Sequence, residues 1–217
     1  MIRAIFWDND GVLVDTERLY YRATRQVLAP AGIDLTPELY RELFLVQGRG
    51  AWHLAADMGM PADEVAQLRQ RRNEIYGELL RGERLVVDGV RETLDLLRGR
   101  CLMGIVTSSR KDHLALIHRD SGLLPHFVFV VANGDYRQSK PHPEPYLKAL
   151  ERSGCRPDEC LAVEDSRRGL ISARAAGIRC AVIPTDITRG SDFAGAQAVL
   201  ATVRDLPALL DELDGPR

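Results

Sequence analysis

The 217-residue sequence lacks the features of secreted, membrane-spanning and nucleic-acid-binding proteins. Its four cysteines are scattered without a Cys-x-x-Cys pair, so neither a disulfide framework nor a zinc site is expected. No apolar run approaches the roughly 18 residues of a membrane span, and the first seven residues lack the apolar segment of a signal peptide. The formal net charge of −2 provides no basic surplus for nucleic acid. We expect a cytoplasmic monomer or weak dimer that binds neither membranes nor nucleic acid.

The remaining composition, with 45% hydrophobic and 28% charged residues, is that of an ordinary globular protein. From about residue 90 onward, short apolar runs alternate with helical patterns, which is typical of right-handed βαβ units and a parallel sheet. Residues 17–82 contain helical patterns and no convincing strand. We predict an α/β fold: a Rossmann-like three-layer core with a mostly parallel sheet, formed by residues 1–16 and 83–217, and an inserted all-helical domain at 17–82. The strands predicted after the insertion are 102–106, 127–131, 161–163, 180–184 and 198–200.

The first apolar run, Ile5–Trp7, stops at two carboxylates, Asp8 and Asp10, which are followed by Gly11. A buried strand has no structural need for acids at its end, and burying them is costly unless they are paired, protonated or bound to a metal. Open α/β sheets bind their ligands beyond the carboxyl ends of the strands. The pattern therefore predicts an acidic, metal-dependent site. The alternative, on this motif alone, is an Asp-rich turn in which the glycine supplies the bend.

Later strand ends carry further polar groups: Thr107 and Ser108, then Lys140, then Glu164 and Asp165. Because all carboxyl ends of a parallel sheet lie on one edge, these groups are expected to converge with the first acidic pair. Carboxylates gathered in this way repel one another, so a divalent cation is expected. A donor set made only of oxygen points to magnesium, which also binds substrate phosphate. Lys140 and Thr107 then suit phosphate oxygens.

These motifs, taken together and in this order, resemble those of the haloacid dehalogenase-like hydrolase superfamily. They are Asp8–Thr16, Val106–Ser108, Lys140–Pro143 and Val163–Ser166. Each is a weak signal alone, but the four together at strand ends are specific, and the resemblance covers nearly the whole chain. It is strongest to the branch of phosphatases and β-phosphoglucomutase-like enzymes. In that branch a helical insertion after the first motif is a cap, which implies that residues 17–82 are a cap domain.

The resemblance implies a role for each group that handles phosphate. Asp8 would be the nucleophile and form an aspartyl phosphate, while Asp10 would protonate the leaving oxygen and then activate water. Alternate residues of an extended chain point to the same side, so the two acids can act together. Thr107 would bind the phosphoryl group, helped by backbone N–H groups near Ser108. Lys140 would bridge the phosphate and the nucleophile.

The resemblance also implies a magnesium site. Its ligands would be the carboxylates of Asp8 and Asp165 and the backbone carbonyl of Asp10, with Glu164 binding directly or through water. Arg49, which lies between two glycines of the proposed cap, is a candidate for reaching the substrate. The alternative for this residue is an ordinary arginine in a surface loop.

The implied activity is that of a magnesium-dependent phosphatase acting on a small phosphorylated metabolite, such as a sugar phosphate. Asp10 favours phosphoryl transfer over carbon–halogen cleavage, because a halide leaves without a proton. The main alternative is a β-phosphoglucomutase-like phosphotransferase. It is disfavoured because Tyr20 occupies the place of a histidine in the first cap helix of such mutases, and their cap lysine has no counterpart in Val46–Ala51. A non-catalytic binding protein would require a broken motif, and none is broken.

Several neighbouring residues are given no chemical role by the sequence. Asn9, between the two acids, is expected to face away from the substrate and to matter little. Trp7 is expected in the core. Arg69, Arg71 and Arg72 are interpreted as a solvated helix face.

Overall fold

The computed structural model of the chain describes residues 1–83 and 85–215. These residues form two compact units. Unit 1 consists of Met1–Asp15 with Val86–Arg217, and unit 2 consists of Thr16–Leu85. In the part of the chain that is described, no helix combines the length and the apolar character that crossing a membrane requires.

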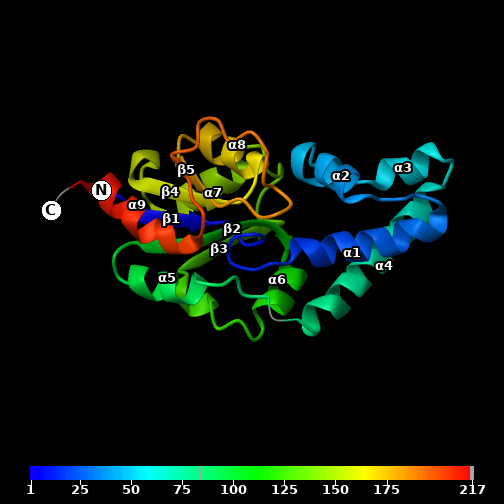
Figure 1. Cartoon of the computed structure of the whole chain (residues 1–217), viewed down its shortest axis with the longest axis horizontal. Helices are drawn as coiled ribbons and strands as arrows, with labels where there is room; N and C mark the ends of the chain where they lie inside the picture. The colour runs from blue at the N-terminus through cyan, green and yellow to red at the C-terminus, as the bar shows by residue number, and fades with distance from the viewer. Residues whose placement is uncertain (84, 216–217) are drawn as a thin grey trace. The chain divides into compact units, whose positions relative to one another are not determined.

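Unit 1 is built on a six-stranded sheet with the order β3-β2-β1-β4-β5-β6, in which every neighbouring pair is parallel (Figure 1). All four residues of β1 are buried, because both faces of this central strand are covered, and its sequence is accordingly continuously apolar. The predicted α/β fold with a Rossmann-like core is confirmed. The strands are β1 (Ala4–Trp7), β2 (Leu102–Arg110), β3 (Phe129–Asn133), β4 (Cys160–Glu164), β5 (Arg179–Val182) and β6 (Ala198–Val199).

Helices cover both faces of this sheet and complete the three layers (Figure 1). One face carries α7 (Glu144–Ser153) and α8 (Arg167–Ala175), and the other carries α5 (Val90–Leu97), α6 (Lys111–His118) and α9 (Leu206–Asp214). Short 3₁₀ turns are η3 (Leu124–His126), η4 (Pro157–Glu159) and η5 (Val203–Asp205). Each crossover returns the chain to the same end of the sheet, so the carboxyl ends of all strands share one edge.

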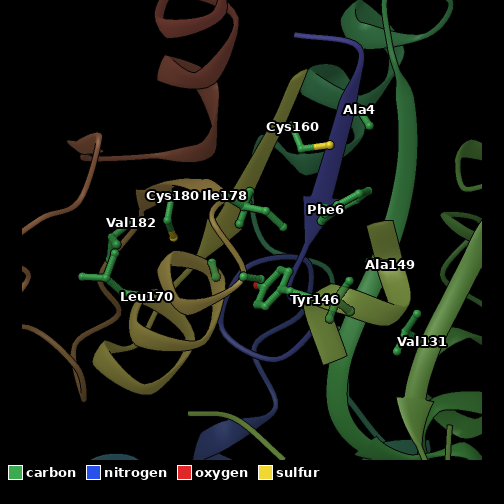
Figure 2. Packing of buried hydrophobic residues seen from close by; sticks show 14 residues of the cluster. Ala4, Phe6, Val131, Tyr146, Ala149, Cys160, Leu170, Ile178, Cys180 and Val182 are labelled. Carbon is green, nitrogen blue, oxygen red and sulfur yellow. The ribbon is translucent and has the colours of Figure 1, made fainter. Parts of the chain in front are cut away.

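The apolar layer between the sheet and helices α7 and α8 is closely packed (Figure 2). Phe6 on β1 and Val131 on β3 contribute from the sheet, while Tyr146 and Leu170 contribute from α7 and α8. The ring of Tyr146 lies between α7 and the sheet and is fully buried. This layer holds β1 and β4 in place, and those two strands end in the acidic motifs.

The observed strands differ from the predicted ones most at the end of β2 and in the position of β3. β2 continues through Thr107 to Arg110 and shifts register against β3 after Val106, so Thr107 is part of the strand and not of a loop beyond it. β3 begins two residues later than predicted, because a 3₁₀ turn that contains Pro125 occupies Leu124–His126. Apolar character marks buried segments and therefore does not locate the point at which strand pairing begins.

Unit 2 contains helices only, as far as its residues are described. Its elements are α1 (Glu17–Leu28), η1 (Ala29–Ala31), α2 (Pro37–Tyr40), the π-helical η2 (Arg41–Val46), α3 (Trp52–Asp57) and α4 (Ala62–Arg81). Helix α2 begins as its sequence predicts: the Leu39 N–H donates to the Thr36 hydroxyl over 3.2 Å, and Pro37 occupies the first turn.

The expectation of a solvated arginine face on α4 is wrong for Arg72. Arg69 and Arg71 are exposed, but Arg72 is buried, with its guanidinium 4.2 Å from the ring centroid of Tyr20. Arg72 lies four residues before the buried Tyr76 and therefore on the core face of the helix. Stacking on aromatic rings favours burial of this cation, an interaction that charge pattern alone does not reveal.

The close packing of β2 against β3 can be tested at Gly104. This residue pairs with Phe129, and a Cβ atom at Gly104 would overlap the phenyl ring. Gly104→Ala should lower the free energy of unfolding by about 1–3 kcal/mol in urea denaturation, because the core must shift to accept the methyl group. Gly82→Ala is the control, since its Cβ would have no neighbour closer than 3.9 Å. Adding Phe129→Leu should recover part of the loss. A Gly104→Ala variant as stable as the wild type would contradict this packing.

Candidate active site

The loop after β1 is held by backbone hydrogen bonds that fix the direction of its acids. The Asp8 N–H donates to the Val163 carbonyl on β4 over 2.8 Å, and two later N–H groups of the loop donate to the Asn9 carbonyl. Gly11 has a φ of +90°, and a Cβ there would overlap the Asp165 carboxylate. Glycine is therefore required both by the backbone conformation and by the close approach of the second acidic motif.

Lys140 lies at the centre of the acidic groups. Its ammonium donates to Asp8 Oδ1 over 2.6 Å, to Glu164 Oε1 over 2.6 Å and to the Val106 carbonyl over 2.8 Å. The Tyr146 hydroxyl also donates to Glu164 Oε1, over 2.6 Å. Only 6% of the Lys140 surface is exposed. Every N–H donor of this buried ammonium thus has an acceptor. The ammonium joins β2, β4, the loop after β1 and the loop before α7.

Burial and neighbouring charges shift the pKa values of Asp8 and Lys140. Burial raises the pKa of Asp8 to about 8; the carboxylates of Glu164 and Asp10 add to the rise, and Lys140 opposes it. Burial alone would lower the pKa of Lys140, but the carboxylates of Asp8 and Glu164 raise it above its ordinary value. Lys140 is therefore a cation, and Asp8 takes up a proton near neutral pH unless further positive charge is present.

Two hydroxyls on β2 hold the second acid. Thr107 donates to Asp10 Oδ2 over 3.2 Å, and Ser109 donates to the same oxygen over 2.7 Å. The Ser109 N–H also donates to the Thr107 hydroxyl over 2.9 Å. Ser108 lies between them with its hydroxyl buried. Ser109 was missed by the sequence analysis, although the alternation of side chains along a strand would have paired it with Thr107.

Asn9, which the sequence left without a role, belongs to a buried polar network. It is fully buried, and its Oδ1 lies 2.7 Å from His118 Nε2 at the end of α6. Its Nδ2 has no hydrogen-bond partner in the described part of the chain. An unsatisfied buried donor costs about 1–3 kcal/mol. Nothing in the sequence near His118 marks it, since the contact joins segments more than a hundred residues apart.

The three acids Asp8, Glu164 and Asp165 offer a site that fits a hard divalent cation. All three are buried, and one carboxylate oxygen from each lies within 4.8 Å of the others. Lys140 occupies Asp8 Oδ1, and Asp8 Oδ2 has no hydrogen-bond partner among residues 1–83 and 85–215. Glu164 Oε1 is committed to Lys140 and Tyr146, so a contribution from this residue would come through Oε2. An oxygen-only donor set of this kind suits magnesium.

The predicted site residues are thus brought together in unit 1, with one exception. Asp8, Lys140 and Glu164 are in direct contact, and Thr107 joins Asp10. The exception is Arg49, which lies exposed in unit 2 between η2 and α3, between two glycines with positive φ.

Comparison with known proteins identifies the family. A model of the haloacid dehalogenase-like hydrolase family matches residues 5–183. The chain belongs to this family. It is 36% identical to Protein CbbY of Rhodobacter capsulatus, over 90% of the chain and 91% of the relative. It is 31% identical to the phosphorylated carbohydrates phosphatase of Thermotoga maritima, over 82% of each.

A crystal structure of CbbY from Rhodobacter sphaeroides has the same fold, with a TM-score of 0.84 and 28% identity over 97% of this chain and all of that one. It is an Asp-to-Asn variant in complex with xylulose 1,5-bisphosphate. The family and its phosphatase members confirm the predicted enzyme class, a phosphoric monoester hydrolase.

The raised pKa of Asp8 predicts a pH-dependent stability. The folded protein keeps a proton on Asp8 up to about pH 8, whereas the unfolded chain releases it near the ordinary value of 3.8. The stability that this proton confers is fully present below the unfolded pKa and is lost as the pH rises through the folded one. Without metal, the free energy of unfolding should fall by about 2 kcal/mol between pH 6 and pH 8 from this group.

Urea denaturation in a chelator at the two pH values measures this loss, with Asp8→Asn as the control that removes the titrating group. Saturating magnesium should stabilise the wild type more at pH 8 than at pH 6, because the cation favours the ionised carboxylate. Identical pH dependence in the wild type and Asp8→Asn would contradict the raised pKa.

Proposed function

We propose that the protein is a magnesium-dependent phosphatase that hydrolyses a small phosphorylated metabolite, a sugar phosphate, through an aspartyl phosphate on Asp8. The observation that carries this proposal is the buried contact of Lys140 with Asp8, beside the oxygens of Glu164 and Asp165. The contact fixes the orientation of the Asp8 carboxylate and supplies positive charge beside this proposed nucleophile. The sugar-phosphate class is supported by the phosphorylated carbohydrates phosphatase and by the xylulose 1,5-bisphosphate complex of the CbbY variant.

Magnesium would be held by the carboxylates of Asp8, Asp165 and Glu164 and by the backbone carbonyl of Asp10. When bound, the ion supplies positive charge that offsets the clustered carboxylates and attracts the phosphate oxygens of the substrate. Lys140 offsets part of the same negative charge through its contact with Asp8 Oδ1.

The proposed reaction proceeds in two displacements at phosphorus. Asp8 attacks the phosphorus atom, the bond to the leaving oxygen breaks, and Asp10 gives that oxygen its proton. Asp10, now a carboxylate, takes a proton from water as the water oxygen attacks the same phosphorus atom. The bond between phosphorus and Asp8 breaks, which releases inorganic phosphate and restores both acids. Thr107 and Ser109 hold Asp10 in the meantime, through its Oδ2.

Residues 17–82, which lie within unit 2, are proposed to act as the cap that selects the substrate, with Arg49 as a substrate-binding residue. Closure of a cap would exclude bulk water from the aspartyl phosphate. The four cysteines are free thiols, which suits the proposed cytoplasmic location.

The mutase alternative is disfavoured by the surroundings of Tyr20. Its ring packs edge-on against Tyr76, with centroids 5.1 Å apart, and lies under the Arg72 guanidinium. A phenol does not exchange protons near neutral pH as an imidazole does, because its ordinary pKa is about 10. Tyr20 is thus placed as an aromatic packing residue.

Loss of the nucleophile should abolish turnover. With magnesium, the wild type should release phosphate from at least one member of a panel of phosphorylated sugars, glycolate phosphate and nucleotides. Asp8→Asn should lower kcat at least about a thousandfold, because the amide cannot form the aspartyl phosphate. Asp10→Asn should lower kcat by about 10² to 10⁴, the usual contribution of a general acid and base. Asp186→Asn, at a side chain that is 97% exposed, is the control. Turnover retained by Asp8→Asn would refute the nucleophile assignment.

Phosphatase and mutase activities can be separated with one substrate. On incubation with β-glucose 1-phosphate, magnesium and a glucose bisphosphate primer, the proposed phosphatase should release inorganic phosphate and free glucose. Formation of glucose 6-phosphate as the main product, followed by a coupled dehydrogenase assay, would instead establish the mutase.

A further inference from the structure

Asn9 connects the acidic loop to a buried network at the end of α6. Its Oδ1 lies 2.7 Å from His118 Nε2, and His118 Nδ1 lies 2.9 Å from the Ser121 hydroxyl oxygen. That oxygen also accepts from the Leu123 N–H over 3.1 Å. Asn9, His118 and Ser121 are all buried. The network therefore joins the peptide between the two acids to the end of α6 and the turn that follows it.

The partners define one arrangement of protons in this network. Burial lowers the pKa of His118, although the Asp10 carboxylate opposes this, so the imidazole is neutral at pH 7. A neutral ring has one donor and one acceptor. Nε2–H donates to the Asn9 Oδ1, and Nδ1 accepts from the Ser121 hydroxyl. Both ring nitrogens of His118 are then satisfied.

This arrangement is not the one that stability alone would favour. Asn9 Nδ2 is buried without a partner among the residues that the structure describes, which costs stability. Asparagine adds a second point at which the loop between the two acids is held. Its backbone carbonyl accepts from the N–H groups of Leu13 and Val14, and its side-chain oxygen accepts from His118. With both oxygens held, the peptide units that lead to the two acids cannot turn freely.

We propose that Asn9 and His118 are positioning residues, which keep Asp10 in the orientation that lets it protonate the leaving oxygen. The carboxylate of Asp10 is held from β2 by Thr107 and Ser109, and its backbone is held from α6 through Asn9. Helix α6 follows β2 directly, so both supports belong to one segment of the chain. This inference rests on the proposed phosphatase function.

The test compares two leaving groups. An alkoxide needs the proton of Asp10, whereas p-nitrophenolate departs with little help, so misplacing Asp10 should affect the two esters unequally. Kinetic constants would be measured with magnesium for the sugar phosphate that the wild type hydrolyses fastest and for p-nitrophenyl phosphate. Asn9→Leu and His118→Leu should lower kcat/KM for the sugar phosphate at least about tenfold. This constant reports the step in which the leaving oxygen departs, whereas hydrolysis of the aspartyl phosphate, which also uses Asp10, is common to both esters. The kcat/KM for p-nitrophenyl phosphate should fall much less.

Two further variants separate positioning from general loss of structure. His118→Gln, whose amide N–H can replace Nε2–H, should keep kcat/KM for the sugar phosphate within about threefold of the wild type. The double variant Asn9→Leu with His118→Leu should be no slower than either single one, because both remove the same contact. Thr93→Val is the matched control: Thr93 is buried on α5 and donates to the Val203 carbonyl over 3.4 Å. Thr93→Val should leave the hydrolysis of both esters unaffected.

If His118→Leu fails to fold, as judged by circular dichroism, Asn9→Leu and His118→Gln decide the question. The proposal is overturned if the variants lose activity toward both esters equally, or if they keep full activity toward both. It is also overturned if His118→Gln is as slow as Asn9→Leu. A wild type that hydrolyses no phosphate ester would instead overturn the proposed function, and this inference with it. If the wild type is active and the variants lose activity toward both esters equally, the inference alone is overturned.

Discussion

The ammonium of Lys140 is the interaction on which the acidic edge of the sheet depends. It is buried, and it donates to a carboxylate from the loop after β1, to a carboxylate at the end of β4 and to a carbonyl of β2. Removing one partner of such a buried charge group leaves the others uncompensated, which typically costs about 3–5 kcal/mol. The same contacts that stabilise the fold therefore fix the proposed nucleophile, and stability and function are linked at this residue.

Keeping these groups together costs free energy elsewhere in the structure. Burial raises the pKa of Asp8 to about 8, and the Nδ2 donor of Asn9 is buried without a partner among residues 1–83 and 85–215. The parallel sheet makes this possible, because every strand delivers its end to one edge while apolar layers cover both faces. Sites built on rigid strands hold their groups more accurately than sites built on loops. The cost of gathering acids is what a divalent cation and a phosphate ester would offset together.

Much of this arrangement was predictable from local sequence. Apolar runs that stop at Asp8, Thr107 and Glu164 indicate parallel strands with polar ends, and the parallel topology then brings those ends to one edge. Strand bounds were less accurate, since burial extends beyond the hydrogen-bonded pairs. The missed residues, Ser109, His118 and Tyr146, act through contacts between distant segments, which leave no local pattern. Arg72 was misjudged for the same reason: helical spacing places it on the core face, but only the aromatic rings around it explain why a cation is buried there.

The most direct measurement is to find where the phosphoryl group is attached during turnover. The wild type would be mixed with magnesium and its fastest phosphate ester, quenched in acid within milliseconds, reduced with borohydride to convert any acyl phosphate to a stable alcohol, and mapped by peptide mass spectrometry. The account predicts reduction of Asp8, in the peptide that contains the first motif, and of no other carboxylate. Modification of a different residue, or turnover with no acyl phosphate at any quench time, would contradict it.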